Sequence, residues 1–251
     1  MPENKSVRKK ALTATDFVRW EAALEAESQL HLIDREAPST EEYQSTGMAA
    51  VHTLDEIFQR IRTEAGLRDN WEETKVRIRV EGIEVSNRAS KIATCFSFGV
   101  NWDHFELKSS LRHFGFLNNV GDEFWLELGL LFNVGKVTLE TGDLQRSISS
   151  KEGNRTLLRN ESSVVFRMIR NHILATQEKE TPQVLSLNLS WPRTNPLEEV
   201  LPKAIEGFAL LYKLEYRLYR CAYLATRQTV KRVMKKQGWH GSVKEHMPRI
   251  Y

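Results

Sequence analysis

The amino-acid sequence predicts an α+β fold, with acidic N-terminal helices, a central antiparallel sheet of about five strands and a long amphipathic C-terminal helix. Three observations support this prediction. Apolar residues recur at helical spacing before residue 74, whereas they alternate with polar residues from Lys75 onward. Residues 208–237 contain neither glycine nor proline, so an unbroken helix of about thirty residues fits there.

Composition and length exclude several classes of protein. The chain has 251 residues, of which 41% are hydrophobic, and its net charge is only +3, so general disorder is excluded. Two cysteines cannot build a disulfide framework or a four-cysteine zinc site. No apolar run approaches the ~20 residues of a membrane-spanning helix, and the N-terminus lacks a secretory signal. We therefore expect a cytoplasmic protein without membrane association.

Three regions follow one another along the chain. We expect a flexible basic tail over residues 1–12, an acidic helical region over 13–73 and an α+β core over 74–251. In the acidic region a helix is predicted over residues 48–65, ending at Gly66, with its apolar stripe at Val51, Leu54, Ile57, Phe58 and Ile61. The sequence leaves open whether the chain is one compact domain or two docked units with a seam near residue 74.

The core region contains several runs with the period of half-buried strands. Strands are predicted over residues 75–80 with a continuation over 81–85, and over 91–102, 123–134, 135–140 and 184–191. In the run 123–134 one face would hold Phe124, Leu126, Leu128 and Leu130, and Asn133-Val134-Gly135 would form a hairpin connection. A helix is predicted over residues 162–177, before the last strand.

The C-terminal helix has two distinct sides, and Pro202 and Gly207 mark a kink or interruption near its start. A core-facing stripe is predicted at Phe208, Leu211, Tyr212, Leu218, Tyr219, Ala222, Tyr223, Val230 and Val233. A second arc, within about 40° of one line, holds six cations: Lys213, Arg217, Arg220, Arg227, Lys231 and Lys235. Glu215 is the only acid between residues 213 and 236, and it projects toward the apolar side.

Charge is unevenly distributed along the chain. Residues 11–73 carry fourteen acidic and five basic side chains, and residues 213–251 carry ten basic and two acidic ones. The cationic arc extends over about 33 Å, a length that suits a phosphate backbone. It could also be simply solvated, or pair with acidic helices of this chain or of a partner. We expect a nucleic-acid-associated binding protein, non-catalytic and part of a larger assembly, with RNA or DNA and other protein subunits as partners.

Two weaker patterns point to catalysis, and no cofactor or metal is expected. Arg167 precedes His172 on a predicted helix, and their spacing resembles that of HEPN-type ribonucleases, which implies an acid–base histidine and a phosphate-holding arginine. Met168 departs from that pattern, in which a polar residue follows the arginine. Asp103, Glu106 and Lys108 are the elements of a magnesium-dependent nuclease site, but their spacing is too tight. A nuclease and a purely protein-interacting subunit, docking through acidic and basic surfaces, are therefore the alternative functions.

Overall fold

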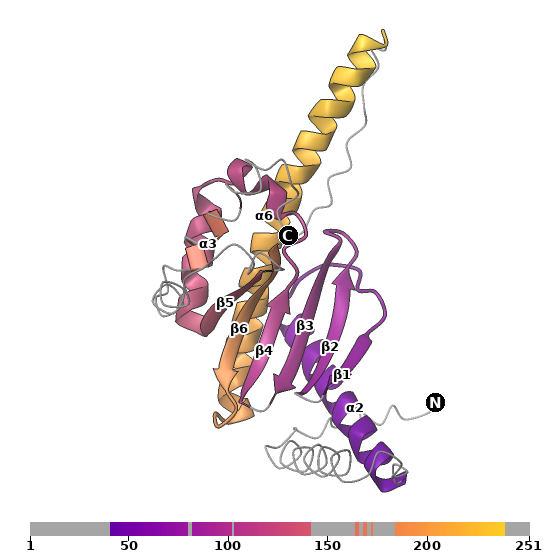
Figure 1. The fold of residues 1–251 in the computed structure, drawn as a ribbon, viewed down its shortest axis with the longest axis vertical. Coiled ribbons are helices and arrows are strands. Elements are labelled where there is room, and N and C mark those ends of the chain that lie inside the picture. Colours follow the sequence, from indigo (N-terminus) through magenta and orange to yellow (C-terminus); the bar gives the residue numbers. More distant parts are fainter. Residues whose placement is uncertain are drawn as a thin grey trace, which may run out of the picture.

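The computed structural model describes residues 41–79, 82–101, 103–141, 164–165, 168–169, 172 and 184–238. It confirms the α+β class, with an antiparallel sheet and a long C-terminal helix (Figure 1). The elements are α2 (Glu41–Glu64), β1 (Lys75–Arg79), β2 (Gly82–Ala89), β3 (Thr94–Asn101), β4 (His104–Ser109), η1 (Phe114–Asn119), α3 (Asp122–Val134), β5 (Lys136–Thr141), β6 (Val184–Pro192) and α6 (Leu197–Lys236).

Six antiparallel strands form one sheet in the order β1-β2-β3-β4-β6-β5. The helices α2 and α6 lie side by side behind it (Figure 1). Alternation within the strands explains this arrangement, because Ile83 and Val85 of β2 are buried toward the helices while Glu84 points to the other face. The same alternation continues on β4, where Phe105 and Leu107 are buried. Polar side chains therefore occupy the face opposite the helices.

Sequence periodicity anticipates most of these elements. The strand predicted over residues 75–80 is β1, but its predicted continuation over 81–85 belongs to a separate strand, β2, which runs back antiparallel to β1. The predicted strand over residues 184–191 is β6. Gly66 follows the end of α2 with φ at +68°, a conformation that glycine adopts without steric cost. Residues 104–109, for which no strand is predicted, form the further strand β4. Of the helix predicted over residues 162–177, the described residues 164–165, 168–169 and 172 are helical.

The predicted strand over residues 123–134 is wrong, because this segment is the helix α3. Its buried residues are Phe124, Leu128, Leu131 and Val134, which follow the helical period. Leu126 and Leu130, expected on the same face as Phe124, are 69% and 51% exposed. The hairpin predicted at residues 133–135 is correspondingly the junction between α3 and β5. Asp122 and Glu123 in the first turn favour the helix through their interaction with its dipole.

Aromatic side chains from several elements meet in the core between α2, β3 and α6. The ring of Phe208 on α6 lies 5.9 Å from that of Phe58 on α2 and 5.1 Å from that of Phe96 on β3. Tyr212 stacks on Phe96 with centroids 5.8 Å apart, and its hydroxyl donates a hydrogen bond to Asp69 Oδ2 at 2.5 Å. Residues of α2, the sheet and α6 thus belong to one buried cluster.

The helix α6 continues without interruption through Pro202 and Gly207 and is 40 residues long, or about 60 Å. Gly207 is buried against β6, and a Cβ atom at this position would lie 2.6 Å from Leu189 Cδ1. The missing side chain therefore lets α6 approach the sheet closely. None of the helices in the described part of the chain has an apolar stretch of the length that crossing a bilayer requires.

Candidate nucleic-acid interface

The helix α6 consists of a packed part and a projecting part. Its buried residues extend from Leu197 to Ala222 and contact the sheet, α2, α3 and η1. Beyond Ala222 no described residue of the helix is buried. Figure 1 shows this C-terminal end, in yellow, continuing past the edge of the sheet. We refer to residues 223–236 as the arm.

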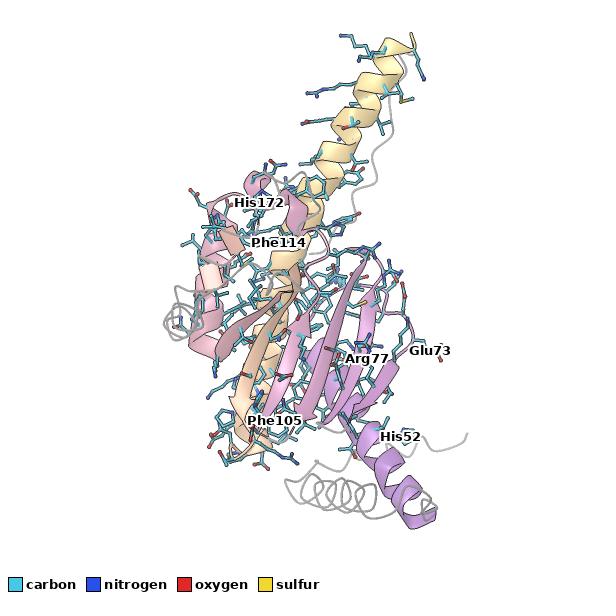
Figure 2. The ribbon with its side chains drawn as sticks, viewed as in Figure 1. His52, Glu73, Arg77, Phe105, Phe114 and His172 are labelled. Atoms are coloured by element: carbon cyan, nitrogen blue, oxygen red, sulfur yellow. The ribbon has the colours of Figure 1, made fainter. Side chains whose placement is uncertain are left out.

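The arm carries cations and no carboxylates. Its five basic side chains are Arg227, Lys231, Arg232, Lys235 and Lys236, and all except the half-buried Arg227 are exposed. The sequence contains no aspartate or glutamate from residue 216 to residue 244. Figure 2 shows long side chains leaving the arm in several directions. The arm therefore presents positive charge over about half of its circumference, along about 21 Å of helix.

The six predicted phosphate-binding residues fall on both parts of α6. Lys213 and Arg217 are half-buried in the packed part, whereas Arg220 is exposed where the helix leaves the core. Arg227, Lys231 and Lys235 lie on the arm. The predicted set omits Arg232 and Lys236, because on a helical wheel they lie on a different side of the helix from the six predicted cations. The distinction between the two sides matters less in the arm, where no described residue of the helix is buried.

Arg217 is engaged in an ion pair with α3. Its Nε lies 2.6 Å from Glu127 Oε2, its Nη2 lies 2.8 Å from Glu127 Oε1, and its Nη1 lies 3.9 Å from Glu123 Oε2. A bidentate pair of this kind is strong and holds the guanidinium plane in place. Arg217 therefore fastens α3 to α6. Sequence patterns do not indicate this pair, because they predict a strand for the segment that contains Glu127.

The predicted core-facing stripe is only half correct. Phe208, Leu211 and Leu218 are buried as expected, but Val230 and Val233 are 44% and 48% exposed. The periodicity of a helix shows which residues share a side, but it does not show where the neighbouring structure ends. The sheet ends before the arm begins, so these valines extend past the core (Figure 1).

Glu215 points into the core, as its place on the wheel predicts. It is fully buried between α6 and the sheet, where Thr94 Oγ1 lies 3.5 Å from its Oε2. Burial raises the pKa of this carboxyl to about 8, and the hydroxyls of Ser109 and Thr94 act in the opposite direction. At neutral pH Glu215 is therefore protonated and uncharged, so it does not offset the positive charge on the cationic side of α6.

The nuclease candidate at His172 is only partly within the described residues. Arg167 lies outside them. The ring of His172 packs edge-on against Phe114 of η1, with centroids 6.1 Å apart (Figure 2). Burial lowers the pKa of His172, so the imidazole is neutral at pH 7. These contacts place the histidine against the core beside η1.

The second candidate, on β4, forms a polar network on the face opposite the helices. Glu106 Oε1 lies 3.1 Å from His104 Nε2, and Glu106 Oε2 lies 2.8 Å from Lys108 Nζ. His104, Glu106 and the exposed Asp103 line a cleft of about 440 Å³ beside β5 and β6. Among the described residues no three histidine, cysteine or acidic side chains are grouped to hold a metal ion. Glu106 is thus engaged by a lysine and a histidine.

Comparison with known protein families, curated proteins and solved structures finds no match for this chain.

Proposed function

We propose that this protein binds RNA or DNA through the phosphate backbone, using the cationic residues of α6. In this proposal it is a non-catalytic cytoplasmic subunit of a larger assembly. The observation that carries the proposal is that α6 leaves the core as an exposed arm with five cations and no acid. Each phosphate that such residues neutralise releases counterions, which gives salt-dependent affinity without sequence readout.

The composition of the arm is costly for an isolated helix. Arg227, Lys231 and Lys235 follow one another at four-residue spacing, and so do Arg232 and Lys236. Each of these like-charged pairs destabilises a helix by a few tenths of a kcal/mol. A solvated helix face without a partner usually mixes acids and bases, which would turn this cost into a gain. A polyanion in contact with the arm removes the repulsion, which favours a phosphate backbone as its ligand.

The packed part of α6 contributes less to this interface than the arm. Arg217 is held by Glu127, and Lys213 is half-buried, so neither extends as far from the surface as the lysines of the arm. Arg220, Arg227, Lys231 and Lys235 remain on one line, and Arg232 and Lys236 add charge beside it. We therefore expect most of the binding energy to come from residues 220–236.

Charge reversal on the arm tests the proposal. The triple variant Lys231→Glu, Arg232→Glu, Lys235→Glu should bind 20-nucleotide RNA and DNA at least tenfold more weakly in fluorescence anisotropy. Because about 0.7 ions are released per phosphate contact on a single strand, the slope of log K against log salt should fall by about 2. A matched control reverses Lys75, Arg77 and Lys136, which are equally exposed on the sheet and change the net charge by the same amount.

The outcome separates the proposed function from its alternatives. Equal losses in the arm variant and the sheet control would show that only net charge matters, and would contradict an interface on α6. Cleavage of the RNA that is lost in His172→Ala would identify a nuclease instead. If nucleic acid is not bound, but the mass of the purified protein shows an assembly that dissociates at raised salt, the arm is a protein-docking surface.

A further inference from the structure

Three tyrosines lie at the base of the arm, next to its line of cations. Tyr216, Tyr219 and Tyr223 are spaced by three and four residues, so they share one side of α6. All three are half-buried, which leaves part of each ring accessible. The rings of Tyr219 and Tyr223 are tilted by 34° with centroids 6.3 Å apart. This side borders the line of Arg220, Arg227 and Lys231 on the helical wheel.

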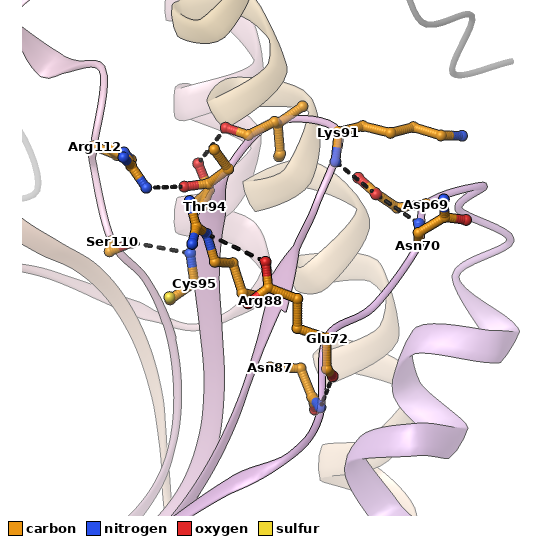
Figure 3. Close-up of polar contacts among 12 residues, drawn as sticks. Asp69, Asn70, Glu72, Asn87, Arg88, Lys91, Thr94, Cys95, Ser110 and Arg112 are labelled. Carbon is orange, nitrogen blue, oxygen red and sulfur yellow. Dashed lines mark hydrogen bonds and ion pairs between the residues drawn. The ribbon is translucent and has the colours of Figure 1, made fainter.

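A histidine from another element completes this group of rings. The ring of His113 lies 5.5 Å from that of Tyr219, edge to face. His113 Nε2 lies 3.1 Å from the carbonyl oxygen of Ile92. Arg112 Nη1 donates a hydrogen bond to the carbonyl oxygen of Ala93 at 3.0 Å (Figure 3). These contacts tie the segment after β4 to the turn between β2 and β3. The ring of His113 and its contact with Tyr219 are therefore held in place before any ligand arrives.

The rings of Tyr219 and His113 are neutral at physiological pH. Burial raises the pKa of Tyr219, with the neighbouring Tyr223 and Tyr216 adding to the shift, and burial lowers the pKa of His113. The group thus offers aromatic surface with little charge, whereas the arm beyond it offers charge with little aromatic surface. These two properties, side by side, are those of proteins that hold unpaired nucleotides by stacking bases and neutralising phosphates.

We infer that the nucleic acid bound by α6 is single-stranded, with bases stacking on Tyr219 and Tyr223 while phosphates follow the cations of the arm. This inference rests on the proposed function. The bases of a duplex stack on each other and are not available to the tyrosine rings, so a duplex would contact the cations alone. Every base has an aromatic face, so the preference would be for single strands and not for a sequence. RNA and DNA share this chemistry, and parallel measurements on both distinguish them.

The experiment compares three ligands of equal length: a single strand, its duplex and a single strand whose central nucleotides lack bases. Tyr223 is the position to change, because it is not among the residues packed on the core. Tyr223→Leu should weaken binding of the single strand roughly 5- to 100-fold, the effect of losing one stacked base. Tyr223→Phe should retain the affinity, because the ring remains. The exposed Gln228→Ala on the arm is the matched control.

The ligands separate the inference from the proposed function. On the base-free strand wild type and Tyr223→Leu should bind equally, and on the duplex they should agree within twofold. If Tyr223→Leu weakens all three ligands alike, or none of them, while the arm charge reversal still matters, the inference is overturned and the proposed function stands. If the wild-type protein binds none of the ligands, the proposed function itself fails. Circular dichroism of each variant confirms that α6 remains folded.

Discussion

Replacing the buried Glu215 by glutamine should remove much of the pH dependence of stability. Glu215 is fully buried between α6 and the sheet, and burial raises its pKa to about 8 from an ordinary value of 4.5. Between these two values the folded protein holds a proton that the unfolded chain has released. The contribution of Glu215 to the free energy of unfolding is therefore fully present below pH 4.5, and it is lost as the pH rises toward 8.

The size of the effect follows from the two pKa values. One pKa unit corresponds to about 1.4 kcal/mol, so the carboxyl would cost about 3 kcal/mol at pH 7 and about 5 kcal/mol above pH 8. These are upper limits, because a charged Glu215 can recruit water or shift its neighbours. Glutamine has nearly the same shape and does not titrate. The free energy of unfolding of Glu215→Gln should therefore exceed that of the wild type by an amount that grows with pH.

Urea unfolding at pH 5, 6, 7 and 8 measures this difference directly. The difference between variant and wild type cancels the contribution of the histidines, which are common to both. Glu198→Gln, an exposed position on the same helix, serves as the control and should give parallel curves. If Glu215→Gln also gives a curve parallel to that of the wild type from pH 5 to 8, the carboxyl is not desolvated and the reasoning is refuted.

The remaining predictions test the packing that positions the arm. Leu128→Ala should destabilise the protein by about 2–5 kcal/mol in urea unfolding, because it empties a buried site, whereas Leu126→Ala should change stability by less than about 1 kcal/mol. Comparable losses at both positions would restore the strand assignment, in which the two leucines share one face. Gly207→Ala should cost about 1–3 kcal/mol, because the added methyl group overlaps β6, and an unchanged midpoint would contradict the close approach. Arg217→Ala and Glu127→Ala, made singly and together, should lower the free energy of unfolding non-additively, with a coupling energy of about 1–3 kcal/mol. Additive losses would contradict the ion pair.

Local periodicity predicts those parts of this fold whose apolar residues fit only one period, either that of a strand or that of a helix. Strand β2 buries every second residue, and the alternation of its sequence follows this burial. The segment 122–134 fits two periods, because leucines at 126, 128 and 130 alternate while leucines at 128 and 131 follow a helix. Only the position of α3 against α6 decides between them. The choice is tertiary, so periodicity alone could not make it.

The candidate interface shows the same division between local and tertiary information. A wheel identifies the cations of α6, but two facts about them depend on distant elements. Glu127 comes into contact with Arg217 only once α3 folds, and the arm is exposed only because the sheet ends near Ala222. Arg232 and Lys236 enter the interface for this second reason. The sequence therefore predicts the pattern of positive charge on α6, but it does not predict which of these cations are exposed.

The two parts of α6 depend on one another in a way that explains why so long a helix is needed. An isolated helix of fourteen residues is marginal in water, and repulsion between its cations makes the arm weaker still. The packed part supplies the nucleus, because its buried residues fix about seven turns of helix against the sheet and α3. The arm extends that helix one residue at a time, at no further cost of nucleation. A rigid row of cations is thereby held clear of the core, which reduces the ordering entropy that a polyanion would otherwise have to offset on binding.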